Sequence, residues 1–428
     1  MTTPRNEKPC CPSSLDPELL RARKRPRLAQ VLERWASVPL SEYSAQLWTH
    51  RPRSDVDPLL LDELERHLKA QGVSDSMHAA VLTEFQEHRI LQTATHLCLS
   101  EGPTFLAVHL AAISGQPPGR PYLVGAYSGV PFSNPAWSGC LNISRRWGLE
   151  HLLEESRHTA KAQLKSEGDQ RRDGAISLER RISFIPAAER DALVFGSSVG
   201  EKANQVQGDL HARLKKVFVE VKPGGLFSAW ALPTASRVLS AVVGREDIVF
   251  FDLNAIVSGY LAKALELPEH PMTQLLFGQV PIAGLSNLLG QERPWFVQGR
   301  RRGKRLRVES LRLLDGMLIG HELRLPWRPS VIAAALRSGR ICPGLLPCFA
   351  ALAFLNGVFC LGSFDQLEYL HEMKLALAEI SWPDSGVVDQ RVDGLTSGRC
   401  WDVEDGMPVW PLDLYLGHPW QPPLHETL

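Results

Sequence analysis

Residues that could do chemistry gather in the stretch THLCLSEGPTFLAVHLAAISG, from Thr95 to Gly115. His96 and Cys98 come just before Gly102-Pro103-Thr104, and His109 follows where apolar residues recur at helical spacing. Three kinds of site use such residues: a metal site, a cysteine nucleophile with a histidine base, and a turn that binds an anion at the start of a helix. The stretch alone leaves all three open.

The pattern around this stretch favours the anion-binding turn. A β-rich segment (residues 90–100) precedes Gly102, and Pro103 suits the first turn of a helix, where backbone N–H groups are free. Gly102 would let a phosphate approach the backbone, and Thr104 adds a hydroxyl. A purely structural turn explains the same residues equally well. The spacing of the two histidines and the cysteine matches no recognised set of metal ligands, so we expect no metal here.

The segments on either side predict a parallel sheet. Residues 115–120 (GQPPGR) break the helix, and PYLVGAYSGVPFSN (121–134) has the composition of a strand that opens into a loop. A strand, a helix and a strand at this spacing form a βαβ unit, so residues 95–102 and 122–128 should be parallel neighbours. Further strands are predicted at residues 191–197, 247–254, 294–299 and 357–363.

The expected architecture is therefore α/β, with a doubly wound parallel sheet in residues 89–381. Helical spacing in residues 28–48, 58–70 and 76–87 predicts an N-terminal helical cap within residues 1–88. The core should carry a charged excursion near residues 156–186, and residues 382–428 should form an irregular tail with several proline and tryptophan residues.

Polar residues follow the predicted strands, where ligands bind in open parallel sheets. Ser128, Ser133 and Asn134 come after the second strand, and Asp252 and Asn254 come after the third. We expect these five residues to line a substrate pocket. Asp252 is equally well explained as a helix N-cap.

Composition limits the partners. The chain has 428 residues with 47 basic and 47 acidic side chains, which argues against bulk attraction to nucleic acids or acidic membranes, so we expect neither as a partner, although the balance does not exclude a local patch. The run GRRRGKRLR (299–307) could contact phosphates, and a solvated hairpin explains it at least as well; the basic run RARKRPR (21–27) fits a solvated helix flank. The N-terminus lacks a signal-peptide pattern, so we expect a cytoplasmic protein. The cysteines form no CxxC pair, so we expect reduced thiols. The expected partners are small-molecule substrates.

Five blocks in order carry a family resemblance. They are residues 96–113, YLVGAYSGVPFSN (122–134), EDIVFFDLNAIVSGYLAKAL (246–265), residues 294–316 and CPGLLPCFAALAFLNGVFCLGSFDQLEYLHEMKLAL (342–377). They resemble successive segments of the bacillithiol-biosynthesis cysteine-adding enzymes (the BshC family). Gly102-Pro103 matches in the first block, and Gly362, Tyr369 and Lys374 are in register in the last.

The resemblance implies a Rossmann-like core with a nucleotide pocket. The expected activity is that of a ligase that joins an amino acid, with cysteine as a candidate, to an amine or hydroxyl acceptor. ATP is the expected cofactor, with Mg²⁺ as its companion ion. The nucleotide would bind at Gly102, Pro103, Thr104, Gly362 and Ser363. His96, His109 and Asp365 would serve in acid–base catalysis or charge stabilisation, and Tyr369 would join the substrate-binding residues.

The chain departs from the family in two places. The family's acidic EDHD cluster is replaced by residues 127–132, so we expect other substrates, in specialised metabolism. The C-terminal coiled coil of the family has no counterpart, so we expect a monomer, or a dimer built without one. Two alternatives stay open: a non-catalytic relative that binds a partner or small molecule, and a metal- or thiol-dependent enzyme that uses His96 and Cys98.

Overall fold

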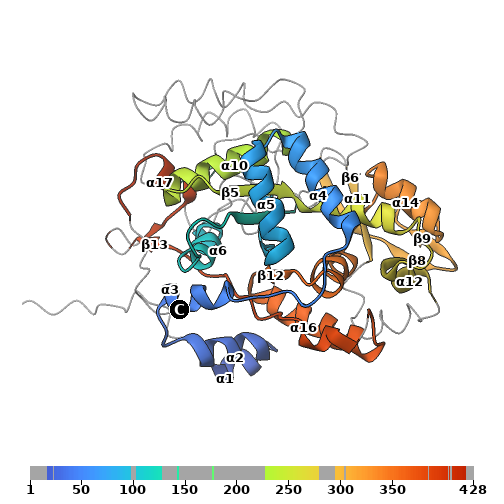
Figure 1. Ribbon diagram of the computed structural model, residues 1–428, viewed down its shortest axis with the longest axis horizontal. Helices are drawn as coiled ribbons and strands as arrows, with labels where there is room; N and C mark the ends of the chain where they lie inside the picture. Colours follow the sequence, from blue (N-terminus) through green and yellow to red (C-terminus); the bar gives the residue numbers. More distant parts are fainter. Residues whose placement is uncertain are drawn as a thin grey trace, which may run out of the picture.

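A sheet of four parallel strands forms the centre of the protein, in the order β12-β1-β2-β5 (Figure 1). The computed structural model describes residues 17–22, 24–97, 103–127, 142–143, 176–177, 227–278, 295–302, 305–383, 385–402, 404 and 407–420. The four strands are β1 (Ile90–Gln92), β2 (Tyr122–Ala126), β5 (Ile248–Asp252) and β12 (Phe359–Leu361).

Both faces of this sheet are covered. All residues of the four strands are buried, and their side chains alternate between two apolar clusters. Leu123 and Phe251 pack with the helices on one face, and Val124 and Phe250 pack with those on the other. Continuous apolar strands of this kind are typical of parallel sheets between two helical layers. The predicted α/β class is therefore confirmed.

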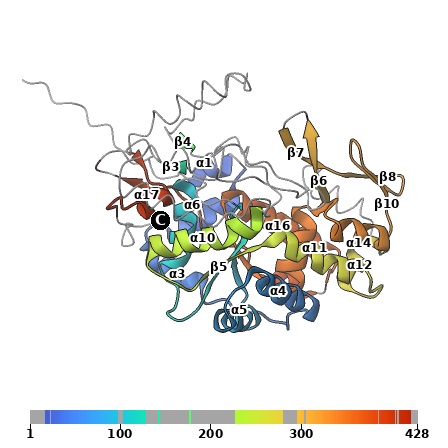
Figure 2. The same cartoon turned by 90° about the horizontal axis from the view of Figure 1, so that it is seen from above.

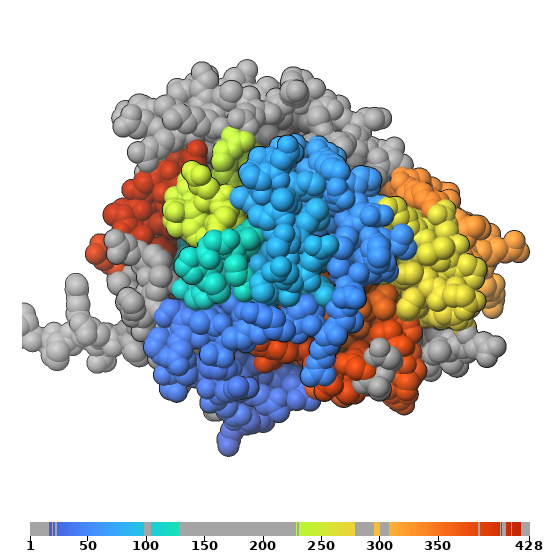
Figure 3. Space-filling view, in the orientation of Figure 1, coloured from blue at the N-terminus to red at the C-terminus, as the bar shows by residue number. Residues whose placement is uncertain are grey.

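The helices divide between the two faces. The first face is covered by α4 (Pro58–Gln71), α5 (Asp75–Glu87), α11 (Leu253–Ala264), α12 (Pro271–Phe277), α14 (Pro329–Arg337), α15 (Leu345–Phe349) and η3 (Ala350–Leu355). The second is covered by α1 (Pro17–Ala22), α2 (Pro26–Trp35), α3 (Leu40–Leu47), α6 (Pro103–Ile113) and α10 (Phe227–Val243). α16 (Phe364–Glu379) contributes to both clusters. In the space-filling view, α4 and α5 lie at the centre of the face shown (Figure 3).

The N-terminal helices were expected as a cap, and the structure builds them into both layers. The predicted helix at 28–48 is divided into α2 and α3, because Pro39 holds the extended backbone (φ −54°, ψ 142°) that precedes α3. The first N–H groups of α2 are capped from α16: the backbone N–H groups of Arg27 and Leu28 both donate to the Glu368 carboxylate at 3.0 Å. The basic run therefore ends in a helix that is docked on the core.

A buried arginine lies just before β1. Arg89 is 3% exposed, and its guanidinium donates to the carbonyl oxygens of Asn356 (2.8 Å), Ser54 (2.5 Å) and Gln86 (3.4 Å). Gln86 lies in the last turn of α5 and Asn356 ends η3, so the cation satisfies carbonyl oxygens that the helices leave free. Arg89 has a positive φ of 51°, and its own carbonyl accepts from Phe359 N at 2.8 Å, which ties it to β12.

A second, partly buried network joins α4, α11 and α12. The Asp57 carboxylate accepts from His270 Nε2 at 2.7 Å and from the Tyr260 hydroxyl at 2.8 Å, while its other oxygen caps α4 through Leu59 N. His270 Nδ1 accepts from Met272 N at 3.1 Å and so caps α12, which assigns the proton to Nε2. These hydrogen bonds lower the pKa of Asp57 against the opposing effect of its burial.

The remaining strands lie outside the parallel sheet. The antiparallel ribbon of β6 (Phe296–Arg302) and β7 (Arg305–Ser310) is extended by β11 (Cys342–Pro343). A separate sheet holds β8 (Arg312–Leu314), β9 (Met317–Ile319) and β10 (Arg324–Pro326). The ribbon and this sheet lie at the same end of the molecule (Figure 2). β3 (Asn142–Ile143) pairs with β4 (Ile176–Ser177).

Several boundaries differ from the predictions. β1 pairs in parallel with β2 as expected, but it spans Ile90–Gln92. Of the strand predicted at residues 95–102, the structure describes residues 95–97, where His96 forms a parallel bridge with Tyr127. The strand predicted at 294–299 is β6, which belongs to an antiparallel sheet. The strand predicted at 191–197 and most of the charged excursion lie outside the described residues.

The tail has more structure than was expected. It contains η4 (Ser385–Asp389), β13 (Trp401–Asp402), β14 (Met407–Pro408) and α17 (Pro411–Tyr415), and Trp410 is fully buried. Leu395 and Leu416 belong to the cluster on the second face of the sheet. The tail is thus part of the core of the domain. In the part of the chain that the structure describes, no helix has the length and apolarity needed to cross a membrane.

The Asp57 network predicts a pH-dependent stability. Because the pKa of Asp57 is lower when folded than when unfolded, its contribution is present above about pH 4 and is lost as the pH falls through the folded pKa. We expect Asp57→Asn, which keeps a helix-capping oxygen, to cost about 1.5–3 kcal/mol of unfolding free energy at pH 7 and progressively less below pH 4.

Urea unfolding followed by circular dichroism across this pH range measures the difference. Asp62→Asn, on the exposed face of the same helix, is the matched control and should change stability by less than about 0.5 kcal/mol. A cost for Asp57→Asn that stays constant between pH 7 and pH 3 would contradict the assignment.

Candidate functional site at the carboxyl ends of the strands

The residues that follow β1, β2 and β12 lie together at one edge of the sheet. Hydrogen bonds continue the pairing beyond the strands, from Thr93 N to Leu361 O (2.9 Å) and from Tyr127 N to Thr95 O (2.9 Å). This edge is where parallel sheets bind ligands. We call the polar residues gathered here the strand-end cluster: Thr93, Tyr127, Cys348, Cys360, Gln366 and Tyr369.

A chain of neutral hydrogen bonds forms the centre of the cluster. Gln366 Nε2, from α16, donates to Thr93 Oγ1 at 2.9 Å, and Thr93 Oγ1 donates to Leu361 O at 3.0 Å. The Tyr369 hydroxyl donates to Gln366 Oε1 at 3.3 Å. Gln366 and Tyr369 are three residues apart, which places them on the same face of the helix. The amide of Gln366 therefore orients a hydroxyl on either side.

Gly362 makes room for this arrangement. A Cβ atom at this position would lie 2.0 Å from Gln366 Cδ, so only glycine lets the amide lie against the end of β12. Its N–H donates to Gly394 O at 2.7 Å and its carbonyl accepts from Thr396 N at 2.8 Å. Gly362 was predicted at a nucleotide site; the structure shows that it supports the position of Gln366.

Tyr127 and the two cysteines remain protonated at neutral pH. The Tyr127 hydroxyl lies 3.6 Å from Cys348 Sγ, and burial raises the pKa of that hydroxyl well above its ordinary value. Burial also raises the pKa of Cys348 to about 12 and that of Cys360 well above the usual range. A thiol is a nucleophile only as the thiolate, so these groups can donate and accept hydrogen bonds but are unsuited to covalent catalysis.

Two buried oxygen atoms at this edge have no partner within the described part of the chain. They are Thr95 Oγ1, in a residue 1% exposed after β1, and Asn254 Oδ1, in a residue 7% exposed after β5. A buried polar atom without a hydrogen bond costs stability, so it is a candidate contact for a bound molecule.

Asp252 and Asn254, the residues predicted to line the pocket after β5, lie at the opposite end of the strand order from β12. Asp252 caps α11 by accepting from Ala255 N at 3.0 Å. This is the helix N-cap that the sequence offered as the alternative explanation of Asp252. Three strand spacings separate β5 from β12, about 14 Å, so Asn254 and Tyr369 could be reached together only by an extended ligand.

Two of the three predicted acid–base residues lie away from the cluster. Asp365 is on the outer face of α16, where its exposed carboxylate pairs with Arg25 at 2.6 Å. His109 is fully buried, and its Nδ1 lies 3.0 Å from the hydroxyl of Tyr122, the first residue of β2. Burial lowers the pKa of His109 to about 3, so it is neutral at the amino end of the sheet. His96, partly buried and bridged to Tyr127, remains at the edge.

Of the other residues predicted for the site, the structure describes some and leaves others outside its described range. α6 begins at Pro103 as predicted, with partly exposed Thr104 in its first turn, and Ser363 precedes the first residue of α16. Gly102 and Cys98, with Ser128, Ser133 and Asn134, lie outside the described residues.

The described residues contain no group of three or more histidine, cysteine or acidic side chains that could hold a metal ion. Cys342, Cys348, Cys360 and Cys400 form no disulfide within the described part of the chain.

Sequence reasoning missed Thr93, Tyr127, Gln366 and Cys348 as site residues. Their signal was available in part, because Thr93 and Tyr127 directly follow strands and Gln366 lies one helical turn before Tyr369. Cys348 carried no such signal, since its contact with Tyr127 spans 221 residues.

No protein-family model matches this chain, and no curated protein matches it either.

The role of Gly362 can be tested by a double-mutant cycle. Gly362→Ala would push the new methyl group into Gln366 and should cost about 1–3 kcal/mol of stability, as overpacking does. In the background of Gln366→Ala the same change should cost much less, because the obstructing amide is gone. Chemical denaturation of the four proteins measures the coupling, and additive effects would refute the proposed contact.

Proposed function

We propose that this protein is a nucleotide-dependent ligase that joins an amino acid to an amine or hydroxyl acceptor at the carboxyl ends of a Rossmann-like sheet. The observation that carries the proposal is the strand-end cluster: four parallel strands bring to one edge polar side chains, a helix start and two buried oxygens that have no partner among the described residues. Nucleotides bind at this edge in doubly wound sheets.

The start of α6 is the proposed phosphate site. The N–H groups of a first helical turn are free to bind an anion, and the helix dipole favours negative charge there. α6 has eleven residues and follows β1, so its first turn begins close in sequence to Thr95 and His96. Thr95 Oγ1, which has no partner among the described residues, would then donate to a phosphate oxygen.

The neutral hydrogen-bonding groups suit the amino-acid substrate. Tyr369, Gln366 and Tyr127 can orient an amino or hydroxyl group without changing protonation state. Proton transfer needs a group whose pKa lies nearer 7, and His96 is the proposed general base, because His109 and Asp365 lie elsewhere. In the balanced reaction, the amine attacks the activated carboxyl carbon, His96 takes the amine proton, and phosphate, or AMP from an adenylate, leaves.

The resemblance of five ordered blocks to the bacillithiol-biosynthesis cysteine-adding enzymes supports an amino-acid substrate, with cysteine first among the candidates. The loss of the acidic cluster after β2 supports a different acceptor. The high pKa values of Cys348 and Cys360 argue against the thiol-enzyme alternative at these two positions.

Nucleotide binding and turnover separate the ligase from a non-catalytic relative. We expect ATP with Mg²⁺ to bind in calorimetric titration, and amino-acid-dependent phosphate or pyrophosphate release with an amine acceptor. Gly102→Val should reduce affinity about tenfold to a hundredfold, the equivalent of about 1.5–3 kcal/mol for a hydrogen bond to a charged group. His96→Ala should spare binding and lower turnover, and Cys98→Ser should leave both unchanged.

A protein that binds ATP without turnover would favour the non-catalytic relative. Normal ATP binding by Gly102→Val together with inactivity of Cys98→Ser would replace the ligase with the thiol enzyme.

Thr95→Val distinguishes a ligand contact from a structural residue. Valine has nearly the same shape and removes a buried hydroxyl that has no partner in the part of the chain that the structure describes, so folding stability should stay the same or rise by up to about 1 kcal/mol. If Thr95 Oγ1 bonds to a phosphate, ATP affinity should nevertheless fall about tenfold. Thermal melting and calorimetric titration of the same sample measure both, and unchanged affinity would remove Thr95 from the site.

A further inference from the structure

Two buried oxygen atoms at the strand ends have no hydrogen-bond partner among the described residues. Thr95 Oγ1 comes after β1, and Asn254 Oδ1, in a residue 7% exposed, comes after β5. β2 is the strand between β1 and β5, so two strand spacings, about 10 Å, separate the two ends. A single ligand can span that distance. The proposed function gives Thr95 a phosphate oxygen to bind and leaves Asn254 without a partner.

The backbone on both sides of Asn254 is held in place. Asp252 N donates to His67 Nε2, from α4, at 3.1 Å, and the Asp252 carboxylate accepts from Ala255 N at 3.0 Å. These bonds fix the start of α11, which begins at Leu253. A buried carbonyl oxygen without a donor costs stability, and here the backbone is not free to move it toward water. A bound donor would remove that cost.

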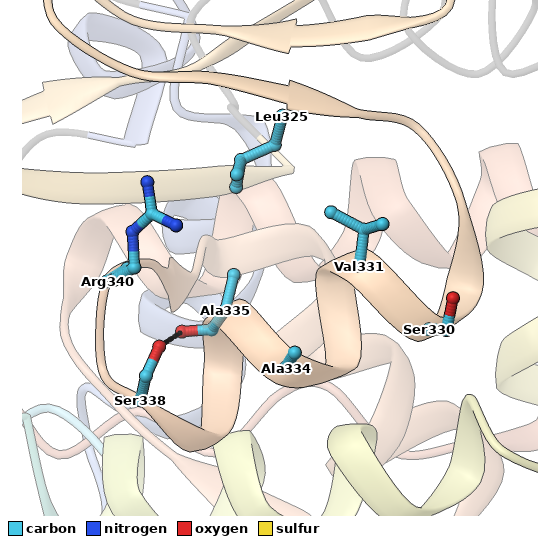
Figure 4. Close-up of a pocket in the computed structure, with 7 residues that line it drawn as sticks. All are labelled: Leu325, Ser330, Val331, Ala334, Ala335, Ser338 and Arg340. Carbon is cyan, nitrogen blue, oxygen red and sulfur yellow. Dashed lines mark hydrogen bonds between the residues drawn. The ribbon is translucent and has the colours of Figure 1, made fainter.

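The hollow between β10 and α14 lacks such an atom. Its volume is about 460 Å³, and the side chains that line it include Leu325, Val331 and Arg340 (Figure 4). In the described part of the chain, no lining side chain has a buried polar atom without a partner, and Ser338 Oγ donates to Ala335 O at 3.1 Å. The unpaired oxygens at the strand ends are therefore the stronger sign of a ligand.

The proton count of the reaction decides which donor fits Asn254. His96 forms a parallel bridge with Tyr127, which follows β2, and β5 is the other neighbour of β2. An attacking atom at the end of β2 would therefore lie between the proposed base and Asn254. It gives one proton to the base as it forms its new bond, and it needs a second hydrogen to donate to Asn254 Oδ1. A neutral primary amine has two hydrogens and a lone pair, whereas a hydroxyl or a secondary amine has one hydrogen.

We propose that Asn254 Oδ1 binds the attacking nitrogen of the acceptor, and that this acceptor is a primary amine. The inference rests on the proposed ligase function. The nitrogen lone pair forms the bond to the activated carboxyl carbon, and the bond from that carbon to the phosphate oxygen breaks, with its electron pair leaving on the oxygen. One proton passes from nitrogen to His96. The other hydrogen stays on the nitrogen of the amide product and keeps its bond to Asn254.

Three small acceptors that differ only at the attacking atom test the proposal on the full chain. They are glycinamide (primary amine), sarcosinamide (secondary amine) and glycolamide (hydroxyl), each supplied with ATP, Mg²⁺ and cysteine. Initial rates of product formation are measured by mass spectrometry. The wild-type protein should use glycinamide with a kcat/KM about tenfold or more above that for either of the others, the equivalent of one hydrogen bond.

Two substitutions of Asn254 separate its oxygen from its amide nitrogen. Asn254→Leu should raise KM for glycinamide about tenfold, remove most of the preference over sarcosinamide, and leave the Kd for ATP unchanged. Asn254→Asp keeps an accepting oxygen and has no N–H to donate, so it should keep the preference for glycinamide. The control is Gln46→Leu, which removes an exposed amide on α3 and should change neither KM nor preference.

Thermal melting checks that each variant folds, and the comparison of acceptors on the wild-type protein needs no variant. Equal use of glycinamide and glycolamide, an unchanged KM in folded Asn254→Leu, or loss of the preference in folded Asn254→Asp would overturn the assignment. So would a protein that binds ATP and uses none of the three acceptors, and that result leaves nucleotide binding in place. A protein that does not bind ATP would instead remove the proposed function, and with it the reaction that this assignment requires.

Discussion

The fold depends on the buried guanidinium of Arg89. Burying a charge is costly, and the two terminal nitrogens of this guanidinium donate to carbonyl oxygens from the ends of α5 and η3 and from Ser54, while Nε has no partner within the described residues. Losing any one of these would leave the cation poorly solvated. Arg89 therefore fixes where α5 ends and, through its own carbonyl, how β12 lies beside β1. Because β1 lies between β12 and β2, the position of the strand-end cluster follows from this junction.

The chemistry of the site follows from how the sheet is buried. With both faces covered, the groups that follow the strands lie in surroundings that penalise ionisation, so the hydroxyl and thiols there remain protonated. Ionised carboxylates such as Asp365 lie at the surface, where water and Arg25 stabilise them. The cluster can thus offer a ligand only neutral hydrogen-bonding groups.

Charge is separated in the same way along the molecule. In the parallel-sheet part, Asp57 accepts from His270, and the buried Glu84 carboxylate accepts from the Arg120 guanidinium, whose Nε donates at 2.9 Å. In residues 308–340, by contrast, Arg312, Arg324, Arg328 and Arg340 are exposed and form no ion pair within the described residues, whereas Arg337 pairs with Glu266.

The sequence alone determined the features that depend on neighbours along the chain. The apolar runs of β2 and β5 predicted strands buried on both sides, Pro103 predicted the start of α6, and Asp252 was recognised as an N-cap. These depend on periodicity, backbone preference and local hydrogen bonds. Only the tertiary structure decided which side chains meet. Helical spacing predicted that His109 lies on α6, but only the packing shows that it contacts Tyr122 in the core. Asp365 pairs with Arg25, which is 340 residues away in the chain. Such contacts depend on how the layers stack, and no local pattern in the chain encodes that.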